Sequence, residues 1–229
     1  MTYHYVWLIW SSAFLLPWVL LYLLFPRHRS AMWWASVLMA PFGFTEPLFV
    51  PEYWNPPSLF ELGQRTGFDI ESVIFSFAIG GIGAVLYNII TRKRPEALRP
   101  EEHHRRRWHR WALATPFALF PILYFLPWNV IHAGIAAMTA GAIAVVLCRP
   151  DLKANTLVGG GLFLALYTIF LLGLKWSAPG YIEQVWNLKA LSGILIYGLP
   201  LEELLFGFAF GLFWTGIYEH FTSKRSVAA

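Results

Sequence analysis

The sequence predicts an all-α, polytopic membrane protein with seven transmembrane helices. Three observations predict it: the composition, a series of long apolar runs, and a one-sided distribution of basic residues. The chain is 57% hydrophobic and only 13% charged, whereas soluble domains are roughly 45 to 50% apolar and about 25% charged. A spanning helix needs about 20 mostly apolar residues, so seven of them with short connections nearly exhaust a chain of 229 residues. The composition therefore excludes an ordinary soluble fold.

The apolar runs are nearly all bounded by charged residues, proline or asparagine, and each is predicted to form a helix. They cover residues 5–25, 32–50, 70–90, 111–126, 130–147, 156–174 and 194–218. The first run is too long for a signal-peptide core and lacks a basic leader, so we expect a retained helix. The fourth is short and contains Pro116 and Pro121, and we expect its helix to begin earlier, near Trp108. Pro200 is expected to kink the seventh helix or to end a preceding turn.

The basic residues indicate the orientation of these helices, because Lys and Arg near helix ends tend to stay in the cytoplasm. With the N-terminus outside and the C-terminus cytoplasmic, fourteen of the seventeen basic residues fall on the inner side. Only Arg65, Lys175 and Lys189 fall outside. The basic stretch 92–110, which includes His103, His104 and His109, is thus interpreted as a cytoplasmic loop that contacts anionic lipid rather than nucleic acid or metal. The single cysteine, Cys148, excludes an internal disulfide and a site made of several thiolates.

An internal repeat appears when residues 69–80 are aligned with residues 200–211. Glu71, Phe75, Phe77, Ala78 and Gly80 meet identical residues, and upstream Trp54-Asn55 meets Trp186-Asn187 after one insertion. Two three-helix units joined by one extra helix must cross the membrane in the same direction, so the repeats are predicted to be parallel. The predicted units are a first repeat (1–92), a basic loop with a linking helix (93–129), and a second repeat (130–229).

Ionisable residues inside spanning segments are costly, so each one is a candidate functional group. The candidates are Glu46, Asp69, Glu71, Glu202 and Glu203. Glu71 and Glu202 occupy equivalent places in the two halves, and we expect them to face a shared cavity near the outer side. Since successive helical residues are about 100° apart, Glu202 and Glu203 should have different partners. A carboxyl group in a dry cavity has a raised pKa and can act as a general acid.

Aromatic residues make up 18% of the chain and form a second group of candidates. Those within helices either pack in the core or line a cavity, where their ring faces would stabilise a carbocation. These residues are Phe75, Phe77, Phe206, Phe208, Phe210, Phe213 and Trp214. Tryptophans near helix ends are typical of the membrane interface. They are Trp33, Trp34, Trp54, Trp176 and Trp186. Gly207 and Gly211 form a small-xxx-small pattern that is typical of helix packing.

Residues 199–206 (LPLEELLF) resemble the Pro-x-Glu-Glu motif, followed by Phe, of the integral membrane lycopene cyclase domain family. The resemblance extends over the whole chain as two repeats and a linking helix. The first copy departs from it, with Asp69 and Ser72 at the positions of Pro200 and Glu203. Asn55 and Asn187 also follow Trp54 and Trp186 where the family is expected to have Asp.

The resemblance implies a redox-neutral cyclisation of a linear carotene, with proton transfer by Glu202 or Glu203 and by Glu71. It implies substrate contacts for the remaining candidates. These are Glu46, Asp69, Trp54, Asn55, Trp186, Asn187, Phe75, Phe77, Phe206, Phe208 and Phe210. Which carboxyl group is the acid and which the base stays open. No metal or cofactor is predicted, and the expected partners are a carotenoid and membrane lipid, with homo-oligomerisation left open.

Two other functions remain as alternatives. A carotenoid or lipid binder without catalysis is one, because the first repeat is degenerate. A glutamate intramembrane protease is the other, although Gly207 stands where those proteases carry an Arg. A retinal-binding protein is disfavoured because residues 194–218 contain no lysine.

Overall fold

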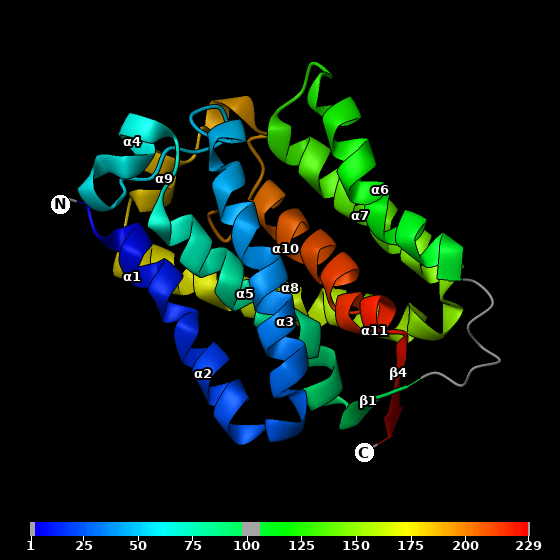
Figure 1. Ribbon diagram of the computed structural model, residues 1–229. Helices are drawn as coiled ribbons and strands as arrows, with labels where there is room; N and C mark the ends of the chain where they lie inside the picture. Colours follow the sequence, from blue (N-terminus) through cyan, green and yellow to red (C-terminus); the bar gives the residue numbers. More distant parts are fainter. Residues whose placement is uncertain (1–2, 98–105, 229) are drawn as a thin grey trace.

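The protein is a bundle of helices with short helical loops at one end and a small two-stranded ribbon at the other (Figure 1). This computed structural model describes residues 3–97 and 106–228. The main helices are α1 (Val6–Ala13), α2 (Leu15–Leu24), α3 (Arg29–Met39), α5 (Ile70–Ile90), α6 (Arg106–Tyr124), α7 (Val130–Cys148), α8 (Lys153–Ser177), α10 (Leu201–Trp214) and α11 (Ile217–Thr222). The short helices are α4 (Leu62–Thr66), α9 (Tyr181–Val185) and the 3-10 segments η1 (Pro26–His28), η2 (Ala40–Leu48), η3 (Leu59–Glu61), η5 (Pro150–Leu152) and η6 (Leu188–Ala190). The strands are β1 (Lys93–Ala97), β2 (Leu195–Ile196), β3 (Leu199–Pro200) and β4 (Lys224–Ala228).

Five helical stretches in the described residues are long and apolar enough to cross a membrane. They are Val6–Leu24, Ile70–Ile90, Val130–Cys148, Pro150–Ser177 and Leu201–Thr222. They match the first, third, fifth, sixth and seventh predicted runs, and α5 has the bounds that the sequence predicts. The prediction of an all-α membrane protein is confirmed at this level, whereas the count of seven spans stays a prediction.

The second and fourth predicted runs are helical but depart from a simple span. The second consists of α3 followed by η2, which contains Pro47. A Cβ added to Gly43 in η2 would lie 2.5 Å from the Val73 backbone, so glycine lets η2 approach α5 closely. The fourth run forms α6, which begins at Arg106 and so earlier than the apolar run, as expected. Part of the basic stretch, with His103 and His104, lies outside the described residues.

The seventh run is not a continuous helix, which corrects the prediction for residues 194–200. These residues form the β2–β3 hairpin, with Tyr197 and Gly198 at φ +54° and +77° in its turn. Helix α10 begins only after Pro200, in agreement with the second of the two roles expected for this proline. Glu202 and Glu203 therefore lie in the first turn of α10. The apolar run had predicted helix before them, but residues 194–200 are a hairpin.

Small residues bring α10 against α8. A Cβ on Gly211 would lie 2.9 Å from both the Gly159 carbonyl oxygen and Gly160 Cα, and one on Gly207 would lie 2.7 Å from the Tyr167 ring. The small-xxx-small interpretation of Gly207 and Gly211 is thus confirmed. On the outer surface, α2 exposes Leu16, Leu20 and Leu24, as a lipid-facing helix does.

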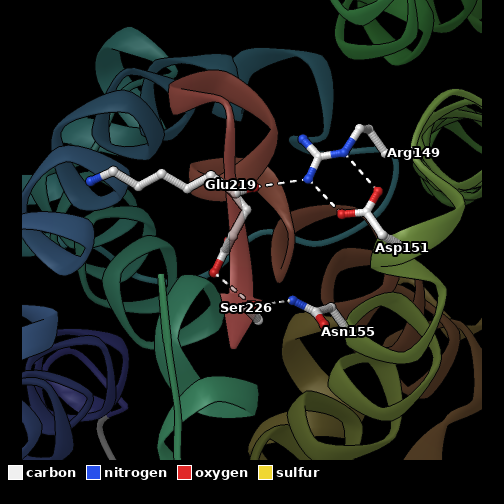
Figure 2. A network of polar contacts seen from close by, with 6 residues as sticks. Arg149, Asp151, Asn155, Glu219 and Ser226 are labelled. Carbon is white, nitrogen blue, oxygen red and sulfur yellow. Dashed lines mark hydrogen bonds and ion pairs between the residues drawn. The ribbon is translucent and has the colours of Figure 1, made fainter. Parts of the chain in front are cut away.

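The end of the bundle opposite α4 and α9 is closed by strands β1 and β4, which pair antiparallel (Figure 1). Figure 2 shows the polar network that attaches β4 to the helices. Arg149 binds both carboxylate oxygens of Asp151 and donates to the Lys224 carbonyl at 2.8 Å. Ser226 accepts a hydrogen bond from Asn155 Nδ2 at 2.8 Å and donates to the buried Glu219 at 3.3 Å. The C-terminal strand is therefore fixed to α8 and α11 by partly buried polar contacts.

Candidate functional site

The loops that precede α5 and α10 meet at Trp54 and Trp186. The backbone N–H of Asn55 donates to the Val185 carbonyl, and the backbone N–H of Asn187 donates to the Tyr53 carbonyl, both at 2.9 Å. The two indole rings lie 5.3 Å apart between centroids. Both tryptophans are buried, so the interface-belt interpretation is wrong for Trp54 and Trp186, whereas Trp33, Trp34 and Trp176 are exposed as that interpretation requires.

The contact between the two loops at Trp54 and Trp186 is called the crossing. Glu203 lies next to it and receives three side-chain hydrogen bonds. Trp186 Nε1 donates to its Oε1 at 2.7 Å, and Tyr53 donates a very short bond to the same oxygen. Tyr167, from α8, donates to Oε2 at 2.5 Å. Glu203 is only 4% exposed. Burial and the nearby Glu203 raise the pKa of Tyr53 well above its usual value, so Tyr53 stays a neutral donor.

Beside Glu203 is an apolar cavity of about 380 Å³. Its volume lies within the range of about 300 to 1,000 Å³ that is common for small-molecule sites. Helices from both halves of the chain and α6 provide its walls. The aromatic residues that line it are Trp7, Phe42, Phe49, Tyr53, Trp54, Phe75, Phe117, Phe120, Tyr167, Phe170, Trp186, Phe206, Phe210, Phe213 and Trp214.

Glu46 is the second carboxyl group in the cavity lining, and it comes from η2 in the first half of the chain. It is 7% exposed and lies close to Ser72, Trp54 and Asp69. Asp69 caps α5 by accepting a hydrogen bond from the Ser72 backbone amide at 2.5 Å. Glu46 and Glu203 thus bring one carboxyl group from each half to the same cavity.

Glu71 and Glu202 are buried but lie outside the cavity lining. Each accepts a hydrogen bond at 2.7 Å from a backbone amide of the loop that leads into its own helix. Leu59 donates to Glu71 and Ser192 donates to Glu202. His132 Nε2 also lies 3.6 Å from Glu202. Glu202 and Glu203 therefore have different partners, as the helical spacing predicts.

The other predicted contact residues divide into two groups. Trp54, Trp186, Phe75, Phe206 and Phe210 line the cavity, as do Phe213 and Trp214. Phe77 packs instead against Trp18 and Trp33, and Phe208 lies against Gly160 of α8. Asn55 and Asn187 are exposed beside the crossing, and Asp69 serves as a helix cap.

Tyr53 and Tyr167 were not among the residues singled out from the sequence. Tyr53 directly precedes the repeated Trp54-Asn55 pair, which could have indicated it. Tyr167 lies within the apolar run of α8, where a tyrosine looks like ordinary packing. Only the packing of α8 against α10 brings its hydroxyl group to Glu203.

The arrangement can move a proton at the edge of an apolar cavity. A buried carboxyl group with neutral donors is suited to general acid or base chemistry, and the ring faces around it can stabilise a cation. Fold and site together define an integral membrane protein with an acidic group at an aromatic cavity.

Residues 129–221 match the family model described as lycopene cyclase, so this part of the chain is similar to a lycopene cyclase domain. The match begins at Asn129, the N-cap of α7, and ends within α11, so it contains Tyr167, Trp186 and Glu203. Comparison with curated proteins and with solved structures gave no match. The family supports a carotenoid cyclase-like function and a hydrophobic substrate.

Proposed function

We propose that this protein is a membrane-embedded carotenoid cyclase that closes the end group of a linear, lycopene-type carotene into a ring. The observation that carries the proposal is the placement of Glu203. Its carboxyl group is buried, receives hydrogen bonds from Tyr53, Tyr167 and Trp186, and borders an apolar cavity with aromatic walls. The similarity of residues 129–221 to a lycopene cyclase domain supports the same substrate class.

The proposed reaction is a redox-neutral isomerisation. A carboxylic acid gives its proton to the terminal double bond of the carotene, which leaves a tertiary carbocation. The next suitably placed double bond attacks this cation, so a carbon–carbon bond forms and the positive charge moves into the new ring. A carboxylate then removes a proton beside the charge and a ring double bond remains. The proton count is unchanged, and water must be excluded because it would trap the cation.

Glu203 and Glu46 are the carboxyl groups that the cavity favours for these two proton transfers. The sequence favoured Glu202 or Glu203 together with Glu71, but Glu71 and Glu202 bind loop amides away from the cavity lining. We assign Glu203 and Glu46 to the reacting pair without ordering acid and base. Glu71 and Glu202 then fix the loops that carry the crossing of Trp54 and Trp186.

We further propose a multi-pass topology in the cell membrane with seven spans, the N-terminus outside, and two parallel repeats joined by α6. Identical residues that recur 131 positions apart, and the contacts they make, support the two repeats. Lys93 Nζ lies 2.6 Å from the Tyr87 hydroxyl group, and Lys224 Nζ lies 3.0 Å from that of Tyr218. Strands β1 and β4 also pair symmetrically. Lys93 pairs with Ala228 and Ala97 pairs with Lys224, so replacing each residue by its repeat equivalent gives the same pairs.

The test of activity is expression in cells that accumulate lycopene, followed by analysis of the extracted carotenoids. We expect the unaltered chain to convert lycopene into a cyclic product and Glu203→Gln to abolish conversion. Glu183→Gln, at an exposed position on α9, is the matched control and should convert normally. Unchanged lycopene in the presence of folded, membrane-inserted protein would contradict the proposal. Copurification of unaltered pigment would then favour a carotenoid binder.

The topology is tested with single cysteines in a Cys148→Ser background and a reagent that does not cross membranes. Thr66 and Lys153 are both exposed, and the proposed orientation places them on opposite sides. We expect intact cells to label Thr66→Cys but not Lys153→Cys. The reverse pattern, or labelling of both, would disprove the proposed orientation.

A further inference from the structure

A second cluster of reactive side chains lies at the other end of the bundle from Glu203. His109 is the fourth residue of α6, Cys148 is the last residue of α7, and His220 is in α11. One ring nitrogen of each histidine and the Cys148 sulfur all lie within 4.8 Å of one another. Both histidines are buried. Three separate helices thus bring two imidazoles and a thiol together.

The hydrogen bonding of His220 prepares one nitrogen for a ligand. Its Nε2 lies 3.1 Å from the His109 carbonyl oxygen. Because a carbonyl oxygen only accepts hydrogen bonds, Nε2 carries the proton in this contact and Nδ1 is left with a free lone pair. His220 is 2% exposed, and its Nδ1 has no hydrogen-bond partner among the described residues. Metal-binding histidines are oriented in this way, with the second nitrogen donating to a carbonyl or carboxylate.

The space around the cluster would admit a further ligand. His109 and His220 both line a second cavity, together with Arg110 and Ser223. Two imidazoles and one thiolate suit zinc or cuprous copper, whereas calcium and magnesium prefer oxygen ligands. Zinc with three protein ligands usually takes a water molecule or another small ligand in the fourth position.

We propose that His109, Cys148 and His220 bind one thiophilic transition-metal ion, with Zn²⁺ as the principal candidate. The ion would join α6 to α7 and α11. Helix α6 also contributes Pro116, Phe117 and Phe120 to the wall of the cavity beside Glu203. Metal binding at the first turns of α6 therefore stabilises the placement of that wall, while the ion takes no part in proton transfer at Glu203.

The experiment uses the full chain in detergent, stripped of metal with a chelator and titrated with Zn²⁺ or Co²⁺. We expect one Zn²⁺ per chain, a higher Tm with metal, and a Co²⁺ spectrum with a thiolate charge-transfer band. X-ray absorption at the zinc edge should show a sulfur neighbour. Cys148→Ser and His220→Gln should each weaken binding by at least about tenfold and remove the Tm increase. A parallel Cu⁺ titration determines which ion the set prefers.

His28→Gln is the matched control, because His28 is also buried but lies in η1, outside the cluster. It should bind metal as the unaltered chain does. The proposal is overturned if the chain binds no Zn²⁺ or Co²⁺, if the bound zinc has no sulfur neighbour, or if Cys148→Ser and His220→Gln bind with unchanged affinity. None of these measurements involves a carotene, so their failure leaves the cyclase proposal untouched.

Discussion

At the scale of single residues, the hydroxyl groups of Tyr53 and Tyr167 determine how Glu203 is held. Tyr167→Phe removes the donor to Glu203 Oε2 and leaves that buried oxygen without this partner. A hydrogen bond to a charged group contributes about 1.5 to 3 kcal/mol, and each 1.36 kcal/mol in a barrier changes a rate about tenfold. We expect cyclisation to slow by about 10- to 100-fold, measured as the initial rate of lycopene loss in membranes.

The control for this substitution is Tyr197→Phe, since Tyr197 is 80% exposed in the β2–β3 turn. It removes the same hydroxyl group from an exposed position that is not among the hydrogen-bond donors to Glu203. Equal rates for the Tyr167→Phe and Tyr197→Phe chains would refute the role given to Tyr167.

Glu202 and Glu203 are neighbours in sequence that should respond differently to substitution. Glu202 accepts the Ser192 amide, and the amide oxygen of glutamine can accept the same bond. Glu202→Gln should therefore reduce conversion less than Glu203→Gln does. In the Glu203→Gln chain, an amide replaces the carboxyl group and cannot carry out its proton transfer. The two variants are compared in one expression system with protein amounts matched by immunoblot. A larger loss in the Glu202→Gln chain would return the catalytic role to Glu202.

The sequence identified Glu203 and Glu46 as candidates because buried acids are costly, and that argument needs no tertiary structure. It also indicated that Glu202 and Glu203 have different partners, from helical geometry alone. It could not indicate which of the two faces the cavity, because that depends on the start of α10 after Pro200. The tyrosine donors depend on long-range packing, since Tyr53 and Glu203 are separated by 150 positions in the sequence.

At the scale of the elements, the contact between α8 and α10 depends on glycine. Gly211→Ala would place a Cβ 2.9 Å from the backbone of Gly159 and Gly160, atoms that cannot move aside as a side chain can. Overpacking of this kind costs about 1 to 3 kcal/mol. We expect a lower Tm in detergent and a displaced Glu203, with reduced cyclisation.

Gly161→Ala on α8 is the matched control, since its Cβ would meet nothing within 4 Å. Alanine also favours helix more than glycine by up to about 1 kcal/mol. The Gly161→Ala chain should therefore keep or raise its Tm. Equal Tm values for the Gly211→Ala and Gly161→Ala chains would contradict the close packing of α8 on α10.

The long helices were predictable where apolar runs end at strong signals. Asp69 and Asn129 cap α5 and α7, and both helices begin at the expected residue. The run 194–218 was misleading because the β2–β3 hairpin is as apolar as the helix that follows it. Its turn residues, Tyr197 and Gly198, and the proline before α10 were the available signals.

At the scale of the whole molecule, the cavity is a property of both halves and of α6 together. Glu46 and Trp54 come from the first half, Glu203 and Trp186 from the second, and Phe117 from α6. The repeat predicts that the two halves meet, but it says nothing about the wall that α6 adds. Which aromatic rings face inward follows from this packing. The equivalent residues Phe75 and Phe206 both line the cavity, whereas Phe77 and Phe208 both lie outside its lining.

The volume of the cavity can be reduced without a collision inside the folded protein. Gly134 of α7 lines the cavity, and a Cβ there would meet nothing within 4 Å. Gly134→Leu should therefore fold normally while filling space that the carotene end group needs. We expect weaker carotenoid binding, measured as quenching of tryptophan emission, because Trp7, Trp54, Trp186 and Trp214 all line the cavity.

Gly161→Leu controls for the larger side chain, since its Cβ is equally unobstructed and Gly161 lies outside the cavity lining. The Gly161→Leu chain should quench on carotenoid addition as the unaltered chain does, and both variants should share one elution profile in detergent. Because the two substitutions differ only in the space they fill, a difference in quenching assigns binding to the cavity. Full quenching and full cyclisation in the Gly134→Leu chain would place the carotenoid elsewhere and remove the basis for a reaction at Glu203.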